Sequence, residues 1–201
     1  FSAYITKYDI QFNEIITPSI YETNSFLIKK QENMTLIEYS VFFGSIQIIY
    51  FLKYKMNAEL SPIMWFEAIH SNSAQIINFL EENHVEPIVT IVKNFKNIEI
   101  TSYEECVNES IKCHHNSITE YLQNNYLQNN DENSSQTIIK SLKYYNFAFL
   151  QKGLINKSTF CYLCHYDYYS LVKDLLEKDD IDINSKIIQK HIILLHSNSF
   201  F

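Results

Sequence analysis

The chain contains no arginine. Its 16 basic side chains are all lysine, and 23 acidic side chains outnumber them, which gives a formal net charge of −7 at pH 7. Proteins that bind nucleic acid usually carry a basic patch and use the arginine fork on phosphates and on guanine. We therefore expect no nucleic-acid partner.

Glycine and proline are scarce, with two and three residues. Because the two glycines, Gly44 and Gly153, are far apart, the chain lacks the glycine-rich loop that cradles phosphates in P-loop and dinucleotide-binding proteins. Folds with many tight turns are also disfavoured, unless asparagine supplies the positive φ angles. The apolar content of 46% over 201 residues suffices for one domain or a short array of repeats.

Long apolar runs are missing as well. The longest one, residues 36–52, is interrupted by polar residues such as Glu38 and Gln47, and it is shorter than the roughly 20 residues of a membrane span. The first residues do not show the basic-then-apolar order of a secretion signal. We expect no membrane span, a cytoplasmic location and reduced thiols at the four cysteines.

What the chain does contain is an internal repeat. Five segments share one pattern, and they lie at residues 36–52, 64–80, 109–122, 137–150 and 158–184. Each has a short apolar stretch, a polar break and a second stretch with apolar residues at helical spacing, as at Ile76, Ile77 and Leu80. Two short helices bury little surface alone, but stacked copies bury a continuous core. The pattern predicts a stack of helix pairs.

The fifth segment, residues 158–184, contains several short motifs in a fixed order. They are Ser158-Thr159-Phe160-Cys161, Leu163-Cys164, Asp167-Tyr168, Leu171-Val172-Lys173 and Leu175-Leu176-Glu177. In this order they resemble the T-P-L-H, A-A, G-H, V-V-K and L-L-E motifs of an ankyrin repeat. The first three segments resemble a divergent ankyrin family, expanded in a protist, whose members have no assigned activity.

The resemblance covers about residues 35–195 and implies an all-α fold, an α-solenoid of about five stacked helix-turn-helix ankyrin-type repeats. Most glycines of the family's hairpin loops are missing, so we expect few or no regular β-hairpins. The predicted repeats are residues 35–62, 63–101, 102–135, 136–157 and 158–184, with a partial sixth from 185. Residues 1–34 have no predicted structure, residues 123–136 are predicted as a flexible loop, and residues 196–201 form a tail.

Residues Cys161 to His165 spell C-x-x-C-H, the attachment pattern of a c-type haem. In the ankyrin alignment both cysteines lie on the first helix of the fifth repeat, and Cys164 replaces a small alanine that packs between helices. A haem would also need an oxidising compartment, of which the sequence gives no sign. We predict a packed helix in which Cys164 is a small buried apolar residue, and no cofactor.

A second cysteine and histidine cluster, CVNESIKCHH, has a spacing that is not typical of zinc sites. The alignment puts Cys113 to His115 in the turn between two helices, where we predict a structural role and no metal. The alternative hypothesis is a metal- or redox-responsive protein. It would use Cys106, Cys113, His114, Cys161 and Cys164.

Four residues occupy equivalent positions near the end of the first helix of their repeats: Phe42, His70, Lys112 and Tyr166. In ankyrin arrays this position lines the concave face, so the four would form a row of binding hot spots. Alternatively, Phe42 packs inward and the others are ordinary surface. The single tryptophan, Trp65, is either a core residue or a further surface anchor for a partner.

No residues form a recognisable catalytic framework. In each of the pairs Glu81-Glu82 and Glu104-Glu105, the two side chains would point in different directions on a helix, so they would not act together as an acid/base pair. No serine lies in the G-x-S-x-G motif of a hydrolase nucleophile. We expect a non-enzymatic scaffold for protein–protein interaction, with an unidentified protein partner and no small-molecule substrate. A further hypothesis is a fragment that folds only within a longer chain.

Overall fold

The computed structural model describes residues 7–8, 15–16, 19–29, 34–87, 102–127, 131–150 and 159–178. The regular structure of these residues is helical, apart from an isolated bridge between Ile15 and Thr35. This confirms the predicted all-α class. No helix in the described part is both long and apolar enough to cross a membrane. The chain divides into two compact units, Phe1–Tyr126 and Leu127–Phe201, and each is described by itself.

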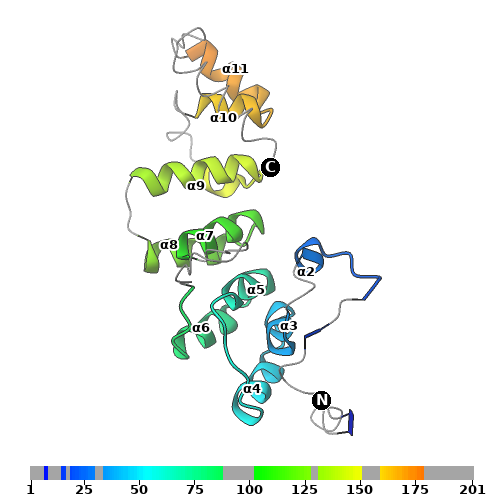
Figure 1. Ribbon diagram of the computed structural model, residues 1–201. Coiled ribbons are helices and arrows are strands. Elements are labelled where there is room, and N and C mark those ends of the chain that lie inside the picture. The colour runs from blue at the N-terminus through cyan, green and yellow to red at the C-terminus, as the bar shows by residue number, and fades with distance from the viewer. Residues whose placement is uncertain are drawn as a thin grey trace, which may run out of the picture. The chain divides into compact units, whose positions relative to one another are not determined.

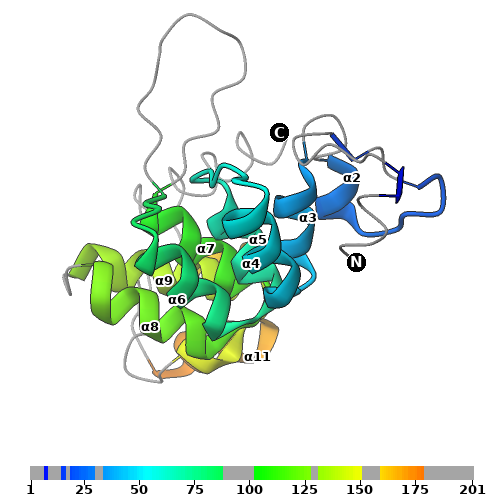
Figure 2. The ribbon, with the colours of Figure 1, turned by 90° about the horizontal axis from the view of Figure 1, so that it is seen from below.

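The first unit is built from pairs of helices (Figure 1). Its helices are α2 (Ser25–Lys29), α3 (Leu36–Phe42), α4 (Ile46–Lys55), α5 (Met64–Ser71), α6 (Ala74–Glu82), α7 (Tyr103–Lys112) and α8 (Asn116–Tyr126). Helix α3 packs against α4, α5 against α6, and α7 against α8. The first helices also pack against one another, so that α5 contacts α3 and α7, as Figure 2 shows from below. Equivalent positions on neighbouring first helices therefore come close together.

The turns that end the first helix of the four pairs and the helix Asp131–Lys143 share their geometry. A residue with positive φ lies in each of these turns, namely Gly44 (70°), Asn72 (51°), His114 (59°), Tyr145 (55°) and Asp167 (60°). In four of them the next amide reaches back five residues, as from Ser45 N to Ser40 O at 2.9 Å. This is the bond of a Schellman motif, which ends a helix on a left-handed residue. The left-handed residue is a glycine in the first of these turns and a polar or aromatic residue in the other four.

Helix α3 begins at a complete capping box. Thr35 Oγ1 accepts a hydrogen bond from the Glu38 N–H at 3.4 Å, and Glu38 Oε2 accepts one from the Thr35 N–H at 2.8 Å. Glu38 also accepts a bond from the Ser61 hydroxyl at 2.8 Å, which ties the start of α3 to the segment before α5. Helix α7 begins similarly, because Ser102 Oγ accepts from the Glu105 N–H at 3.1 Å. These side chains fix where the first helices start.

The core of the first unit lies between the helices of these pairs. Its fully buried apolar residues include Val41, Ile49, Leu52, Ala68, Ile69, Ile76, Leu80, Ile111 and Leu122. Trp65 lies among them with 0% exposure, and its Nε1–H donates to Val85 O at 2.7 Å. The core alternative for Trp65 is thereby confirmed. Its prediction as a surface anchor is wrong, because no part of the side chain reaches the surface.

The second unit contains α9 (Asp131–Lys143), the 3-10 turn η1 (Phe147–Phe149), α10 (Phe160–His165) and α11 (Tyr169–Lys178). Helix α10 packs against α9 and α11. The buried core of this unit consists of Ile138, Leu142, Phe160, Cys161, Leu163 and Leu175. The fifth predicted repeat is therefore a helix pair, α10 and α11, as the sequence pattern indicates.

The region between the third and fourth predicted repeats differs from the prediction. Helix α8 runs to Tyr126 and α9 begins at Asp131, so the prediction of a loop over residues 123–136 is wrong at both ends. The predicted boundary after residue 135 falls inside α9. Ile138 and Leu142, one turn apart, are buried, and their packing outweighs the weak helix propensity of the asparagine and serine residues before them. The predicted sixth repeat and the tail lie outside the described residues.

Candidate functional site

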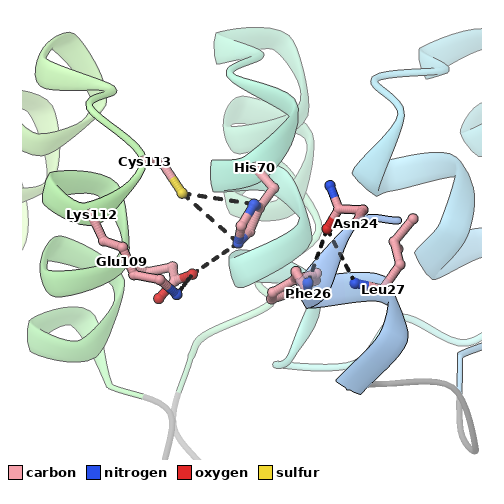
Figure 3. Close-up of polar contacts among 7 residues, drawn as sticks. All are labelled: Asn24, Phe26, Leu27, His70, Glu109, Lys112 and Cys113. Atoms are coloured by element: carbon pink, nitrogen blue, oxygen red, sulfur yellow. Dashed lines mark hydrogen bonds and ion pairs between the residues drawn. The ribbon is translucent and has the colours of Figure 1, made fainter. Parts of the chain in front are cut away.

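The last turn of α5 carries His70 toward α7, where it contacts an acidic side chain (Figure 3). His70 Nε2 and Glu109 Oε1 are 2.8 Å apart. The same Glu109 oxygen accepts a bond from Lys112 Nζ at 2.7 Å. The Lys112 side chain is 44% exposed, whereas those of His70 and Glu109 are 15% and 17% exposed. A partly buried carboxylate thus links the second helix pair to the third.

Glu109 is held in its charged form by these neighbours. Burial alone would raise the pKa of this carboxyl group. The hydrogen bonds from His70 and Lys112, together with the charge of Lys112, outweigh burial and leave the pKa of Glu109 below its ordinary value. The site therefore offers an anionic oxygen at neutral pH.

Cys113, the residue that follows α7, also lies beside the His70 ring (Figure 3). Its Sγ is 3.7 Å from His70 Nδ1 and 3.8 Å from His70 Nε2. Burial, and then the charge of Glu109, raise the pKa of the Cys113 thiol to about 11. The group is therefore a protonated thiol at neutral pH, which becomes a strong ligand when a metal ion displaces its proton.

His70, Glu109 and Cys113 each offer one ligand atom, and these atoms all lie within 4.8 Å of one another. Imidazole nitrogen, carboxylate oxygen and thiolate sulfur are the donors that bind zinc in proteins. The three residues come from two first helices and the turn that follows α7. Within the part of the chain that the structure describes, they are the group of three side chains placed to hold a metal ion.

An aromatic wall closes one side of His70. The Phe26 ring lies 4.0 Å from the His70 ring, and the Phe42 ring stacks on His70 at 5.4 Å. Phe26 belongs to α2, whose start is fixed by Asn24 Oδ1 accepting from the Phe26 and Leu27 N–H groups at 2.9 and 3.3 Å. Leu27 is buried beside Phe42 in a small apolar cluster. The wall brings a segment from outside the helix pairs onto the ends of α3 and α5.

The predicted binding row is contiguous over part of its length. Phe42 contacts His70 directly, and Lys112 joins His70 through Glu109. Phe42 is only 9% exposed, so it packs inward and its prediction as an exposed binding residue is wrong. The physical reason is that α2 covers it. Tyr166 lies in the second unit, half-buried against that unit's core and the His165 ring.

The cysteines predicted as alternative metal ligands differ in burial and belong to both units. Cys106 is buried on α7, where burial and then nearby glutamates strongly raise the pKa of its thiol. Cys161 is buried in the second unit, but Cys164 is exposed, so its predicted packing between helices is wrong. The inward position is taken by Leu163, which is 0% exposed, and Cys164 lies one residue further around the helix. His114 is exposed at its turn.

Sequence reasoning missed Glu109 and placed His70 in a different role. The repeat alignment contains the signal that could have found them, because it makes His70 and Lys112 equivalent positions on neighbouring helices. Glu109 lies one turn before Lys112, and Cys113 follows it. No family model, no curated protein and no solved structure matches the chain. The chemistry of the site is therefore argued from these residues alone.

Proposed function

We propose that the chain is a non-catalytic protein-interaction module, an α-solenoid of ankyrin-type repeats that binds a partner protein along its first helices. The regular contacts between α3, α5 and α7 support this proposal, because they bring equivalent positions of successive helix pairs onto one surface. The repeated Schellman turns support it too, since they give the pairs the same ending.

The observation that carries the proposal is the position of Phe26. This aromatic side chain comes from α2, outside the helix pairs, and lies on Phe42 and His70 at centroid distances of 5.5 and 4.0 Å. The first-helix surface therefore accepts an aromatic residue presented by a short helix. Aromatic side chains in such pockets are typical anchors of protein interfaces. A partner helix with an aromatic residue would fit the same place when α2 moves away.

Quantitative capture from a cytosolic extract tests this function, with the full chain as bait and mass spectrometry as readout. Four baits are compared: wild type, Phe26→Ala, Lys112→Ala and Asn78→Ala. Asn78 is exposed on α6, a second helix, and serves as the matched control. Each bait is first checked for an unchanged helical circular dichroism signal.

We expect one saturable partner whose capture rises with Phe26→Ala, because removing the covering ring increases the fraction of chains with an open surface. Capture should fall with Lys112→Ala and stay unchanged with Asn78→Ala. Equal effects of the Lys112 and Asn78 changes would contradict binding along the first helices. Recovery of chaperones alone would favour a fragment that folds within a longer chain.

A further inference from the structure

We propose that His70, Glu109 and Cys113 form a zinc-binding site that joins the second and third helix pairs. This inference is independent of the protein-binding function. It departs from the sequence prediction of no metal, and it shares only Cys113 with the ligand set of the alternative metal-responsive hypothesis. The other two ligands are His70, in the last turn of α5, and Glu109, in the last turn of α7.

The geometry requires little rearrangement. Zinc bonds of about 2.0–2.3 Å to nitrogen, oxygen and sulfur place the ligand atoms of a tetrahedral site about 3.3–3.6 Å apart. His70 Nε2 is 2.8 Å from Glu109 Oε1 and 3.8 Å from Cys113 Sγ. The nitrogen–oxygen pair has to open by about half an ångström and the nitrogen–sulfur pair to close by a few tenths. The ligand atoms of Glu109 and Cys113 lie within 4.8 Å of each other and have to close by at most about 1.3 Å. Rotations of these side chains supply the shifts.

The surroundings of the three ligands suit a metal ion. Lys112 donates to Glu109 and can remain on the carboxylate as an outer partner, which orients the ligand. Phe26 and Phe42 cover one side of the imidazole with apolar surface. The ligands themselves are half-buried and reachable from solvent. A fourth position remains for a water molecule or for a side chain of a bound partner.

The proton balance of binding is simple. The Cys113 Sγ–H bond breaks, its proton goes to the buffer, and the sulfur binds the ion as thiolate. In the metal-free site His70 Nε2–H donates to Glu109, so binding through Nε2 requires that proton to leave this nitrogen. Exchange with solvent moves it to Nδ1, and the freed Nε2 lone pair binds the ion as a neutral imidazole. Glu109 is already an anion. The site then carries two negative ligands and one neutral ligand against a divalent cation, and no redox step takes place.

An alternative explanation is that His70, Glu109 and Lys112 form an ion-pair network and Cys113 is an uninvolved thiol. Cobalt(II) distinguishes the zinc site from the ion-pair network, because it binds in zinc sites and its bond to a thiolate gives a charge-transfer absorption band. The full chain is prepared without an affinity tag, freed of metal by a chelator and kept reduced by a phosphine. Cobalt(II) is then titrated into wild type, His70→Asn, Glu109→Gln, Cys113→Ser and Cys164→Ser. The last variant is the matched control, since Cys164 is an exposed thiol in the other unit.

We expect the wild type and Cys164→Ser to bind one equivalent of cobalt(II) with a thiolate band, which one equivalent of zinc(II) removes. Cys113→Ser should lose the band, and the His70 and Glu109 variants should bind cobalt(II) at least about tenfold more weakly. Zinc should also raise the melting temperature of the wild type and of Cys164→Ser, but not that of Cys113→Ser. The proposal is overturned if no thiolate band forms, or if the band survives in Cys113→Ser. It is equally overturned if zinc leaves the wild-type melting temperature unchanged.

Discussion

At the scale of single residues, burial decides what each cysteine and aromatic side chain can do. Trp65 and Cys106 are 0% exposed, whereas Cys164 is exposed on the short helix α10. Residues of the same type therefore have different roles. Packing and hydrogen bonds determine what the buried Trp65 and Cys106 can do, whereas Cys164 is free to react with molecules in the solvent.

The hydrogen bond of Trp65 leads to a prediction about stability. Trp65→Phe leaves the Val85 carbonyl oxygen without its indole donor and removes ring volume. We therefore expect the free energy of unfolding to fall by at least about 2 kcal/mol. Urea unfolding followed by far-ultraviolet circular dichroism measures this. Tyr54→Phe is the control, because Tyr54 is 64% exposed and should cost almost nothing. A loss below about 0.5 kcal/mol for Trp65→Phe would contradict the described packing.

Alkylation rates offer a second test at this scale. Burial raises the pKa of the Cys106 and Cys113 thiols, whereas Cys164 is exposed, so access and thiol acidity both favour reaction at Cys164. With metal removed, Cys164 should react first with iodoacetamide, Cys113 second and Cys106 last. Peptide mapping by mass spectrometry over time gives the three rates. Labelling of Cys106 before Cys164 would show that the first unit opens more readily than its buried core indicates.

At the scale of elements, the turn inside each helix pair is the repeated unit. A left-handed residue returns in each turn, although it changes from glycine to asparagine, histidine, tyrosine or aspartate. The Schellman bond accompanies it in every one of these turns except that of Asn72. The backbone conformation is therefore preserved where the side chain is not. Each non-glycine residue there carries some strain, which the packing of the two helices offsets.

Two substitutions at equivalent turns should differ in their effect on stability. Gly44 has φ of 70°, and a Cβ built there would meet Ser71 Cβ at 3.9 Å, an ordinary contact. Gly44→Ala should therefore cost about 1–2 kcal/mol from backbone strain alone. Asn72→Gly relieves strain at φ of 51° and should leave stability unchanged or slightly higher. Thermal melts of the two variants measure the difference, and equal melting temperatures would disprove it.

Helices α6 and α8 are linked through Glu81. The Tyr121 hydroxyl donates to both Glu81 oxygens at 2.9 Å, the Tyr126 hydroxyl donates to Oε1, and Tyr103 stacks on Tyr126 at 3.9 Å. Burial first, and then the hydrogen bond and charge of Glu81, raise the pKa of Tyr121 and Tyr126. Burial, followed by the charges of Glu86 and Glu81, raises the pKa of Tyr103. The cluster is therefore stable while its hydroxyl groups keep their protons.

Alkaline pH should weaken this link. Because the folded-state pKa values of Tyr121 and Tyr126 exceed the unfolded value of about 10, the stabilisation is complete below that pH and is lost as pH rises through the folded-state values. Glu81→Gln removes the charge that contributes to the shift, so the decline should be shallower. Melting temperatures between about pH 8 and about pH 11 test this for both chains. Equally steep curves would rule out a contribution from Glu81.

At the scale of the whole molecule, contacts between distant parts of the sequence create the features that matter for function. Phe26 lies on His70, and His70 reaches Glu109, so one side chain connects α2, α5 and α7 (Figure 3). Neither contact follows from local helix formation. Both depend on the packing of first helices against one another and on the position of α2.

The α2 segment should be separable from the helix pairs. Phe26→Ala removes the ring that contacts Phe42 and His70, so we expect faster hydrogen exchange of the α2 amides while the amides of α3 and α5 stay protected. Native-state exchange with mass spectrometry measures both regions in one experiment. Unchanged exchange in α2 would mean that Leu27, buried beside Phe42, holds the helix by itself. Lost protection in α5 would show that α2 is part of the core.

The sequence by itself determined the all-α class, four of the five helix pairs and the positions of most turns. In the fourth predicted repeat the described residues after α9 form the 3-10 turn η1 in place of the start of a second helix. These features depend on residues near one another in the chain: apolar residues at helical spacing, as at Ile76 and Leu80, and caps such as Thr35 and Ser102. Because these causes act between residues close together in the chain, each segment of the sequence is enough to predict its own helices and turns. The missed start of α9 is the exception, because burial of Ile138 and Leu142 there outweighs local propensity.

Only the tertiary structure decided which side chains are buried and which meet across helices. Trp65 fits a core or a surface equally well by composition, and Phe42 is covered because α2 lies on it. His70 and Glu109 meet because α5 packs against α7, a contact whose register depends on every side chain between the two helices. Long-range packing sums many small energies, and no single motif encodes that sum.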